Sequence, residues 1–132
     1  MLIGTLPAIA HHSFAMYDTA KEMTMTGKLI RFIIGANHSQ YVMHVLKADG
    51  TEAKDSKGQP VTWTIETTSA AQLAAKGITV ETFKYDDIFT VTFNPLRDGR
   101  NGGAQQMGAV LIICGPKMPA GGCNEKTGQK YQ

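Results

Sequence analysis

The chain has 132 residues, with 13 Lys and Arg against 11 Asp and Glu, and a formal net charge of +2. This length predicts one domain that is large enough to bury a core of its own. The basic residues are scattered, which argues against a nucleic-acid-binding surface, and no apolar run reaches the length of a membrane span.

The first ten residues have features of an export signal. A short apolar run over residues 1–6 precedes Ala8 and Ala10, which have the spacing of the small residues before a cleavage site. Cleavage after Ala10 would place the mature protein in the periplasm or outside the cell. No Lys or Arg precedes the run, so two interpretations stay open. Residues 1–10 are either a signal-peptide remnant or a retained apolar segment, and residues 11–132 form a single β-barrel domain.

Three histidines are candidate metal ligands. Cleavage after Ala10 would make His11 the first residue, with an α-amine and a ring nitrogen as ligands, and His12 follows it directly. Amine and imidazole nitrogens suit Cu(II), so copper is the candidate cofactor. His38 lies in a predicted turn that could face the N-terminal arm. The alternative is that His11 and His12 are ordinary surface residues.

Hydrophobic alternation predicts the first half of the fold. A strand is expected at residues 22–34, where the alternation changes phase near Gly27, as at a bulge or bend. A turn at 35–39 separates it from a second strand at 40–47, and a third strand is expected at 61–67. Leu29, Trp63 and Ile65 are expected in the core.

A short helix and two strands complete the predicted elements. Ser69 and Gln72 have the spacing of a capping box, so a helix of barely two turns is expected at residues 69–76. Strands are expected at 88–93 and 106–114, with Val91 and Phe93 in the core. The glycine-rich segment 98–103 is expected to be a flexible loop, and the polar tail 124–132 is expected to fray.

The order of these elements predicts the fold class. Three strands, a helix and two further strands occur in this order in the OB-fold, a small Greek-key barrel. The chain is therefore predicted to be all-β, with a five-stranded OB-like barrel and one short helix between strands three and four. An open β-sandwich is the alternative.

The two cysteines predict a disulfide. Cys114 and Cys123 flank a segment rich in glycine and proline, and such a pair in an exported chain is typical of a bridge that closes a loop. The alternative is a reduced pair in a cytosolic protein. A loop of this size contributes about 2–3 kcal/mol to the free energy of unfolding in the chain-entropy model.

Glu66 and His44 complete the candidate polar residues. Glu66 is a candidate to bind the metal itself or to hold an imidazole in one tautomer. It is equally well placed in the sequence to pair with Arg97 or Arg31. His44 lies among apolar residues in a strand, which favours a structural, hydrogen-bonded histidine. The sequence shows no pattern of catalytic residues, so an enzyme is not predicted.

The motifs together resemble an uncharacterised family of small exported bacterial proteins whose mature chains begin His-His-Ser-Phe. The resemblance extends to about residue 108, and it implies export and a β-rich domain but no known activity. The chain departs from the family at Ala36-Asn37-His38, where the family has Asn-Pro-His, and in its cysteine-containing tail. The matching residues are His11-His12-Ser13-Phe14-Ala15, Tyr17-Asp18, Lys21, Thr26-Gly27, Arg31-Phe32, His38, Trp63, Glu66, Ser69, Leu73, Gly77, Asp87, Pro95 and Arg97-Asp98-Gly99.

Two classes of function are consistent with the sequence. The first is a periplasmic or secreted module that binds copper as a carrier or buffer. The second is a structural protein that associates with itself, for which the apolar residues 1–10 could bind the sheet edge of a neighbouring copy. Loss of residues 1–10 from the intact mass would favour the first class, and their retention would favour the second.

Overall fold

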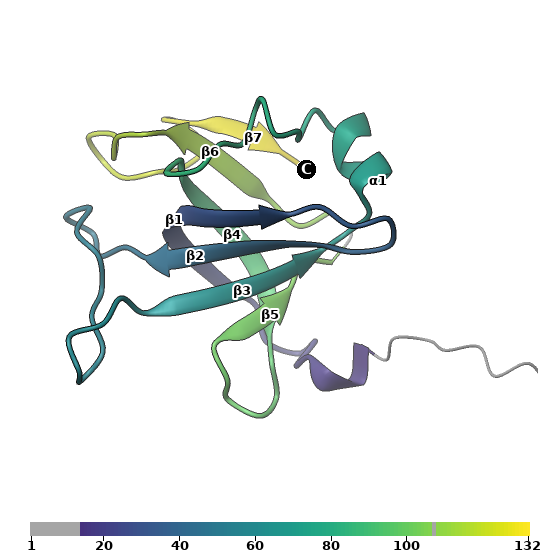
Figure 1. Cartoon of the computed structure of the whole chain (residues 1–132), viewed down its shortest axis with the longest axis horizontal. Coiled ribbons are helices and arrows are strands. Elements are labelled where there is room, and N and C mark those ends of the chain that lie inside the picture. The colour runs from purple at the N-terminus through teal and green to yellow at the C-terminus, as the bar shows by residue number, and fades with distance from the viewer. Residues whose placement is uncertain (1–13, 107) are drawn as a thin grey trace, which may run out of the picture.

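A computed structural model of the chain describes residues 14–106 and 108–132 (Figure 1). The predicted cleavage site at Ala8 and Ala10 and the predicted metal ligands His11 and His12 lie outside these residues. The elements in chain order are η1 (Phe14–Met16), β1 (Met23–Ile33), β2 (Ser39–Val45), β3 (Thr62–Thr67), α1 (Ala70–Ala75), β4 (Ile88–Pro95), β5 (Gly102–Ala104), β6 (Leu111–Gly115) and β7 (Gln129–Tyr131).

Five strands close into a barrel. β1 pairs with β2 and β2 with β3, both antiparallel, and β3 pairs in parallel with β5. β5 then pairs with β4, and β4 pairs with β1 over Met23–Lys28, which closes the circuit. Because α1 lies between β3 and β4, the predicted five-stranded OB-like barrel with one short helix is confirmed.

The helix begins and ends where the sequence predicts. The Ser69 side chain caps it by accepting a hydrogen bond from the Gln72 backbone N–H at 3.3 Å. Gly77 follows the last turn with φ of 84°, a left-handed conformation that glycine adopts without strain. The cap and the glycine confine α1 to six residues.

The last predicted strand was wrong in its bounds. The predicted range was 106–114, whereas β6 begins only at Leu111, and a separate strand, β5, precedes it within the segment that was expected to be a loop. Both β5 and β6 pair with β4, at Asn94–Pro95 and at Ile88–Val91 respectively. The glycines that were expected to make a flexible loop include the first two residues of β5. A Cβ at Gly103 would overlap the Phe93 ring, so glycine is required there for close packing rather than for flexibility.

The expectation of a frayed tail was also wrong. β7 pairs with β6, and the half-buried Tyr131 packs against the core. The Thr127 hydroxyl donates a hydrogen bond of 2.7 Å to the Gly122 carbonyl, which fixes the turn before β7. The polar residues 124–132 are therefore held in place by strand pairing and by hydrogen bonds in the turn.

The bulge in β1 lies after the position expected from the sequence. The pairing with β2 shifts register between Leu29 and Arg31, whereas Gly27 stays in register with Val45. A Cβ at Gly27 would press on the Met43 side chain and the His44 carbonyl. Gly27 therefore allows close approach between the strands, and the change of phase occurs beyond it.

The barrel core contains the residues that alternation placed inside. Leu29, Ile65, Val91 and Phe93 are each at most 1% exposed. Trp63 is only half-buried and packs against the edge of the core, with its ring 5.6 Å from that of Phe93.

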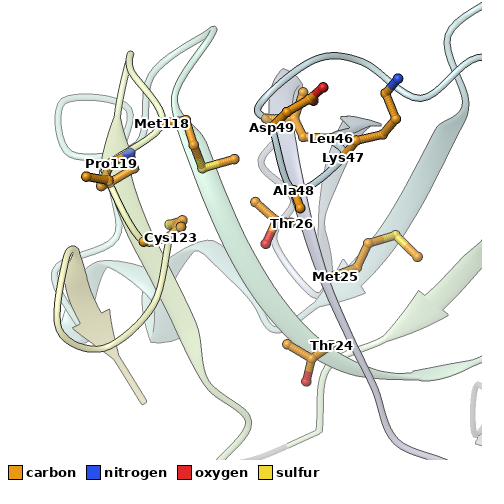
Figure 2. Close-up of a pocket in the computed structure, with 13 residues that line it drawn as sticks. Thr24, Met25, Thr26, Leu46, Lys47, Ala48, Asp49, Met118, Pro119 and Cys123 are labelled. Atoms are coloured by element: carbon orange, nitrogen blue, oxygen red, sulfur yellow. The ribbon is translucent and has the colours of Figure 1, made fainter.

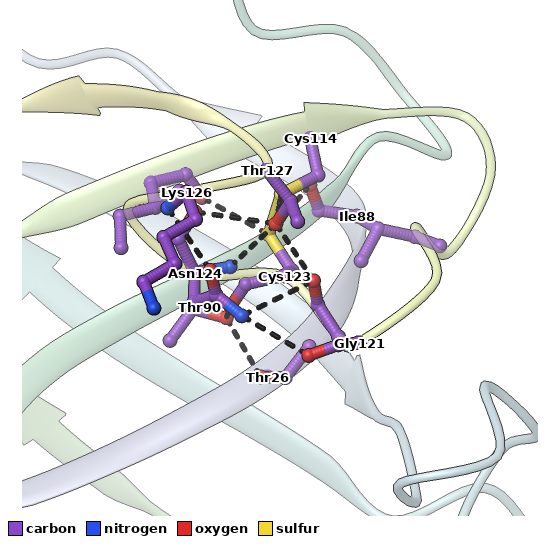
Figure 3. The surroundings of a disulfide bond; sticks show 11 residues. Thr26, Ile88, Thr90, Cys114, Gly121, Cys123, Asn124, Lys126 and Thr127 are labelled. Atoms are coloured by element: carbon purple, nitrogen blue, oxygen red, sulfur yellow. Dashed lines mark hydrogen bonds between the residues drawn. A yellow bond between two sulfur atoms is a disulfide. The ribbon is translucent and has the colours of Figure 1, made fainter.

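The predicted disulfide between Cys114 and Cys123 is present (Figure 3). The Cα atoms are 5.9 Å apart, within the usual range for a bridge. The Thr90 hydroxyl on β4 donates a 2.7 Å hydrogen bond to the Cys123 carbonyl, which ties the bridged loop to the barrel. A disulfide of this kind fits an oxidising compartment.

Membrane-spanning helices are absent from residues 14–106 and 108–132, where no helix has the necessary length and apolarity.

Candidate functional site

Glu66 joins two side chains at one end of the barrel. Its Oε1 lies 3.1 Å from Nδ1 of His38, which belongs to the connection between β1 and β2. Its Oε2 accepts a 2.8 Å hydrogen bond from the Tyr17 hydroxyl. The structure thus brings together two predicted site residues, His38 and Glu66, and the predicted pairing of Glu66 with Arg97 or Arg31 gives way to His38.

Tyr17 fixes the start of the described chain to the same end of the barrel. Its backbone forms a bridge with Leu96, and the Asp18 N–H donates to the Pro95 carbonyl at 2.8 Å. Arg97 adds a backbone hydrogen bond to the Met16 carbonyl at 2.9 Å. The chain that follows His12 is therefore attached to the end of β4.

The Tyr17 phenol stays protonated over a wide pH range. Burial raises its pKa well above the ordinary value of 10, and the hydrogen bond to Glu66 and the charge of Glu66 raise it further. A protonated phenol donates to the carboxylate, so Glu66 keeps its other oxygen directed to His38. The Tyr17 hydroxyl therefore stabilises the orientation of the Glu66 carboxylate.

The ion-pair contact with Glu66 bears on what the His38 ring can bind. When an imidazole carries its proton on the Nδ1 that faces a carboxylate, its lone pair is on Nε2. Metal-binding histidines commonly have this arrangement, because the carboxylate fixes the tautomer and makes the other nitrogen more basic. The His38 side chain is 42% exposed, so solutes reach this end of the barrel.

A groove of about 1210 Å³ opens beside the His38–Glu66 pair. It runs between α1, the segment 104–111 and the end of β7, and both His38 and Glu66 line it. Its apolar wall includes the buried Leu73, Ile78 and Leu111. The groove is larger than the cavities that usually hold small ligands, about 300–1,000 Å³.

Tyr41 also lines this groove and has an unusual environment. Its side chain is fully buried, and its hydroxyl makes no hydrogen bond of acceptable geometry within the described chain, although the Thr67 hydroxyl lies nearby. Burial raises its pKa to about 12, against a smaller lowering by Thr67. No sequence pattern signals this hydroxyl, because Tyr41 occupies an ordinary apolar position in the alternation of β2.

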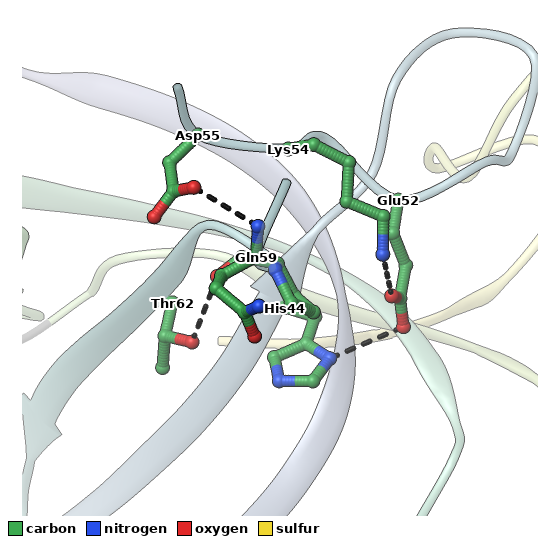
Figure 4. Close-up of polar contacts among 7 residues, drawn as sticks. His44, Glu52, Lys54, Asp55, Gln59 and Thr62 are labelled. Carbon is green, nitrogen blue, oxygen red and sulfur yellow. Dashed lines mark hydrogen bonds and ion pairs between the residues drawn. The ribbon is translucent and has the colours of Figure 1, made fainter. Parts of the chain in front are cut away.

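A second histidine–carboxylate pair lies on the outer side of the sheet (Figure 4). His44 Nδ1 is 3.1 Å from Glu52 Oε1, and Lys54 Nζ is 3.2 Å from Glu52 Oε2. The hydrogen bond from His44 is the main cause, and Lys54 a further one, of a lowered Glu52 pKa. The prediction that His44 is a hydrogen-bonded structural histidine agrees with this arrangement.

A second groove, of about 810 Å³, lies between the disulfide loop and β1 (Figure 2). Met118 from the loop and Met25 from β1 contribute thioethers to its lining. Lys47 and Asp49 lie on the connection after β2 that forms a further part of the lining. His38 and His44 are not among the residues that line this groove in the part of the chain that the structure describes.

Residues 14–106 and 108–132 contain no group of three or more His, Cys, Asp and Glu side chains that could hold a metal ion by themselves. His38 and Glu66 are two such residues. The other two predicted ligands, His11 and His12, lie outside these ranges.

The chain matches one protein-family model over most of its length. The model of a family of unknown function, DUF6152, matches residues 1–105. The chain belongs to this family. No curated protein and no solved structure matches the chain. DUF6152 membership confirms the resemblance to an uncharacterised domain family, and the matched range includes His11, His12, Tyr17, His38 and Glu66.

Proposed function

We propose that this DUF6152 protein is an exported module that binds Cu(II) through His11, His12 and His38. Cleavage after Ala10 supplies the α-amine of His11 as a further ligand, and Glu66 holds the His38 ring. The observation that carries the proposal is the chain of contacts from Tyr17 through Glu66 to His38, at 2.8 and 3.1 Å.

This contact chain restricts the distance between the candidate ligands. Five residue steps separate His12 from Tyr17, and an extended chain covers at most about 18 Å in five steps. Because Tyr17 and His38 share the Glu66 carboxylate, a chain of this length is sufficient for His12 to reach His38. The covalent structure is therefore compatible with a site made by the paired histidines and His38.

Two further observations support export. The Cys114–Cys123 disulfide fits an oxidising compartment, and Ala8 and Ala10 have the spacing of a cleavage site. Coordination also has a clear pH dependence, because amine and imidazole groups bind copper only when deprotonated. Affinity should fall as the pH drops through about 6.5, the ordinary pKa of a histidine.

The test is calorimetric titration with Cu(II) of four proteins. These are the chain that begins at His11, the same chain with His38→Ala, the same chain with His44→Ala, and the full chain that retains residues 1–10. His44 has the same contact to a glutamate as His38, at 3.1 Å, and is the matched control.

We expect His38→Ala to weaken binding by about tenfold or more, the loss of one ligand being worth more than about 1.4 kcal/mol. His44→Ala should leave the affinity unchanged. Retention of residues 1–10 should weaken binding, because the amine becomes an amide. Equal affinity of all four proteins, or dissociation constants no better than micromolar, would contradict the proposal.

A further inference from the structure

We infer that the groove beside α1 binds a neutral, flat organic molecule that presents a carbonyl group to the buried Tyr41 hydroxyl. This site is distinct from the copper site proposed above and does not require the metal. The observations that carry it are the volume of the groove, about 1210 Å³, and a phenol hydroxyl in its wall that makes no hydrogen bond of acceptable geometry within residues 14–106 and 108–132.

The unpartnered hydroxyl indicates the chemistry of the ligand. Buried polar groups in folded proteins nearly always have a partner, and exceptions tend to have a functional cause. The raised pKa of Tyr41 keeps the phenol protonated, so it is a hydrogen-bond donor with an unused proton. The matching group on a ligand is an acceptor that carries no proton, which a ketone, quinone or ester carbonyl supplies.

Two polar side chains of the groove lining, Thr67 and Gln105, bear on how a ligand carbonyl reaches the Tyr41 phenol. Thr67 lies beside Tyr41 and donates to Gln105 Oε1 at 3.2 Å, and Gln105 Nε2 donates to the Val110 carbonyl at 3.3 Å. Both bonds are longer than a typical hydrogen bond of this kind. The Tyr41 hydroxyl is buried, and Gln105, which lines the same groove, is held by these two long bonds, so we propose that a ligand reaches the hydroxyl by moving the Gln105 side chain.

The rest of the lining selects a neutral and mostly apolar body. Leu73, Ile78 and Leu111 give the groove an apolar wall, and its side chains include one lysine and one glutamate, so neither sign of charge dominates. Glu66 is already engaged by Tyr17 and His38. The groove therefore favours an uncharged ring system over an anion or a cation.

The experiment uses Nile red, a neutral aromatic dye with one carbonyl group, and copper-free protein in the presence of EDTA. Fluorescence titration measures the affinity for the wild-type chain and three variants. Ala75→Trp fills the groove from α1. Ala74→Trp puts the same side chain on an exposed position of the same helix that does not line the groove, and is the matched control.

The third variant, Tyr41→Phe, removes only the hydroxyl. We expect saturable binding of one dye per chain, a loss of tenfold or more in Ala75→Trp, and unchanged affinity in Ala74→Trp. Tyr41→Phe should weaken binding by about fivefold, which is the worth of one ordinary hydrogen bond. Its thermal midpoint should not fall, because the hydroxyl has no partner in the free protein.

Several outcomes would overturn the inference. The groove is not the site if Ala75→Trp and Ala74→Trp bind the dye equally, or if wild-type binding does not saturate. The carbonyl assignment is wrong if Tyr41→Phe binds the dye as tightly as wild type. Because EDTA is present throughout, none of these results depends on whether copper binds to the histidines.

Discussion

The two histidine–glutamate pairs of this protein have the same separation and different surroundings. In each, Nδ1 lies 3.1 Å from Oε1. His44 and Glu52 are eight residues apart in the sequence and share their environment with Lys54. His38 and Glu66 come from distant segments and are supported by the buried Tyr17 from a third. The Nδ1–Oε1 distance alone therefore does not distinguish the two pairs, whereas the residues around each glutamate do.

The largest difference between the pairs should appear when each glutamate is removed. Glu66→Ala leaves the Tyr17 hydroxyl without its acceptor on a side chain that is 7% exposed, which should cost about 1–3 kcal/mol of unfolding free energy. Glu52→Ala breaks a surface pair and should cost less than about 1 kcal/mol. Urea unfolding at pH 7 measures both values, and equal losses would remove the distinction between the pairs.

Tyr17→Phe should have an intermediate effect with a characteristic pH dependence. Loss of its hydrogen bond should cost about 1 kcal/mol at pH 7. Because the folded state raises the Tyr17 pKa above 10, this contribution is complete below pH 10 and is lost as the pH rises further. Urea unfolding at pH 8 and at pH 11 should show wild type and variant converging at the higher pH. A gap that stays constant would mean that burial and the Glu66 contact together do not raise the Tyr17 pKa.

Glu52→Gln should have the smallest effect, at the acid end of the range. The lowered Glu52 pKa means that its contribution is present above the unfolded-state value of 4.5 and is lost as the pH falls through the folded-state value. We expect a difference of a few tenths of a kcal/mol at pH 7, because the pair is on the surface. Chemical unfolding at pH 7 and pH 3 checks this, and a difference that grows on acidification would contradict the sign.

Local patterns were sufficient for most of the barrel. The alternation in β3, the cap at Ser69 and the glycine at residue 77 each act within a few residues, so the sequence shows them directly. The strand β5 was not predicted, because Gly103 is required by the close approach of the Phe93 ring, a contact between different strands. The same glycine suggests a flexible loop when only its neighbours in the sequence are considered.

In the candidate site, only the residues whose side chains commonly bind metals could be predicted from the sequence. His38 and Glu66 stand out as residue types that bind metals, and the structure brings them together. Tyr17 was noted only as part of a motif, because its partner lies 49 residues away. Tyr41 differs from a core tyrosine in one missing hydrogen bond, which depends on the whole barrel end and leaves no trace in the local sequence.

The position of β6 beyond the family match has a consequence for expressing parts of this chain. The family match ends at residue 105, between β5 and β6, yet Leu111 and Ile113 on β6 belong to the barrel core. A recombinant fragment cut at the family boundary would lack both side chains and would expose the edge of β4 along Ile88–Val91. Open edges of this kind recruit strands from other molecules, so the fragment should form inclusion bodies. The range that matches the family model is therefore shorter than the range that builds the folded core.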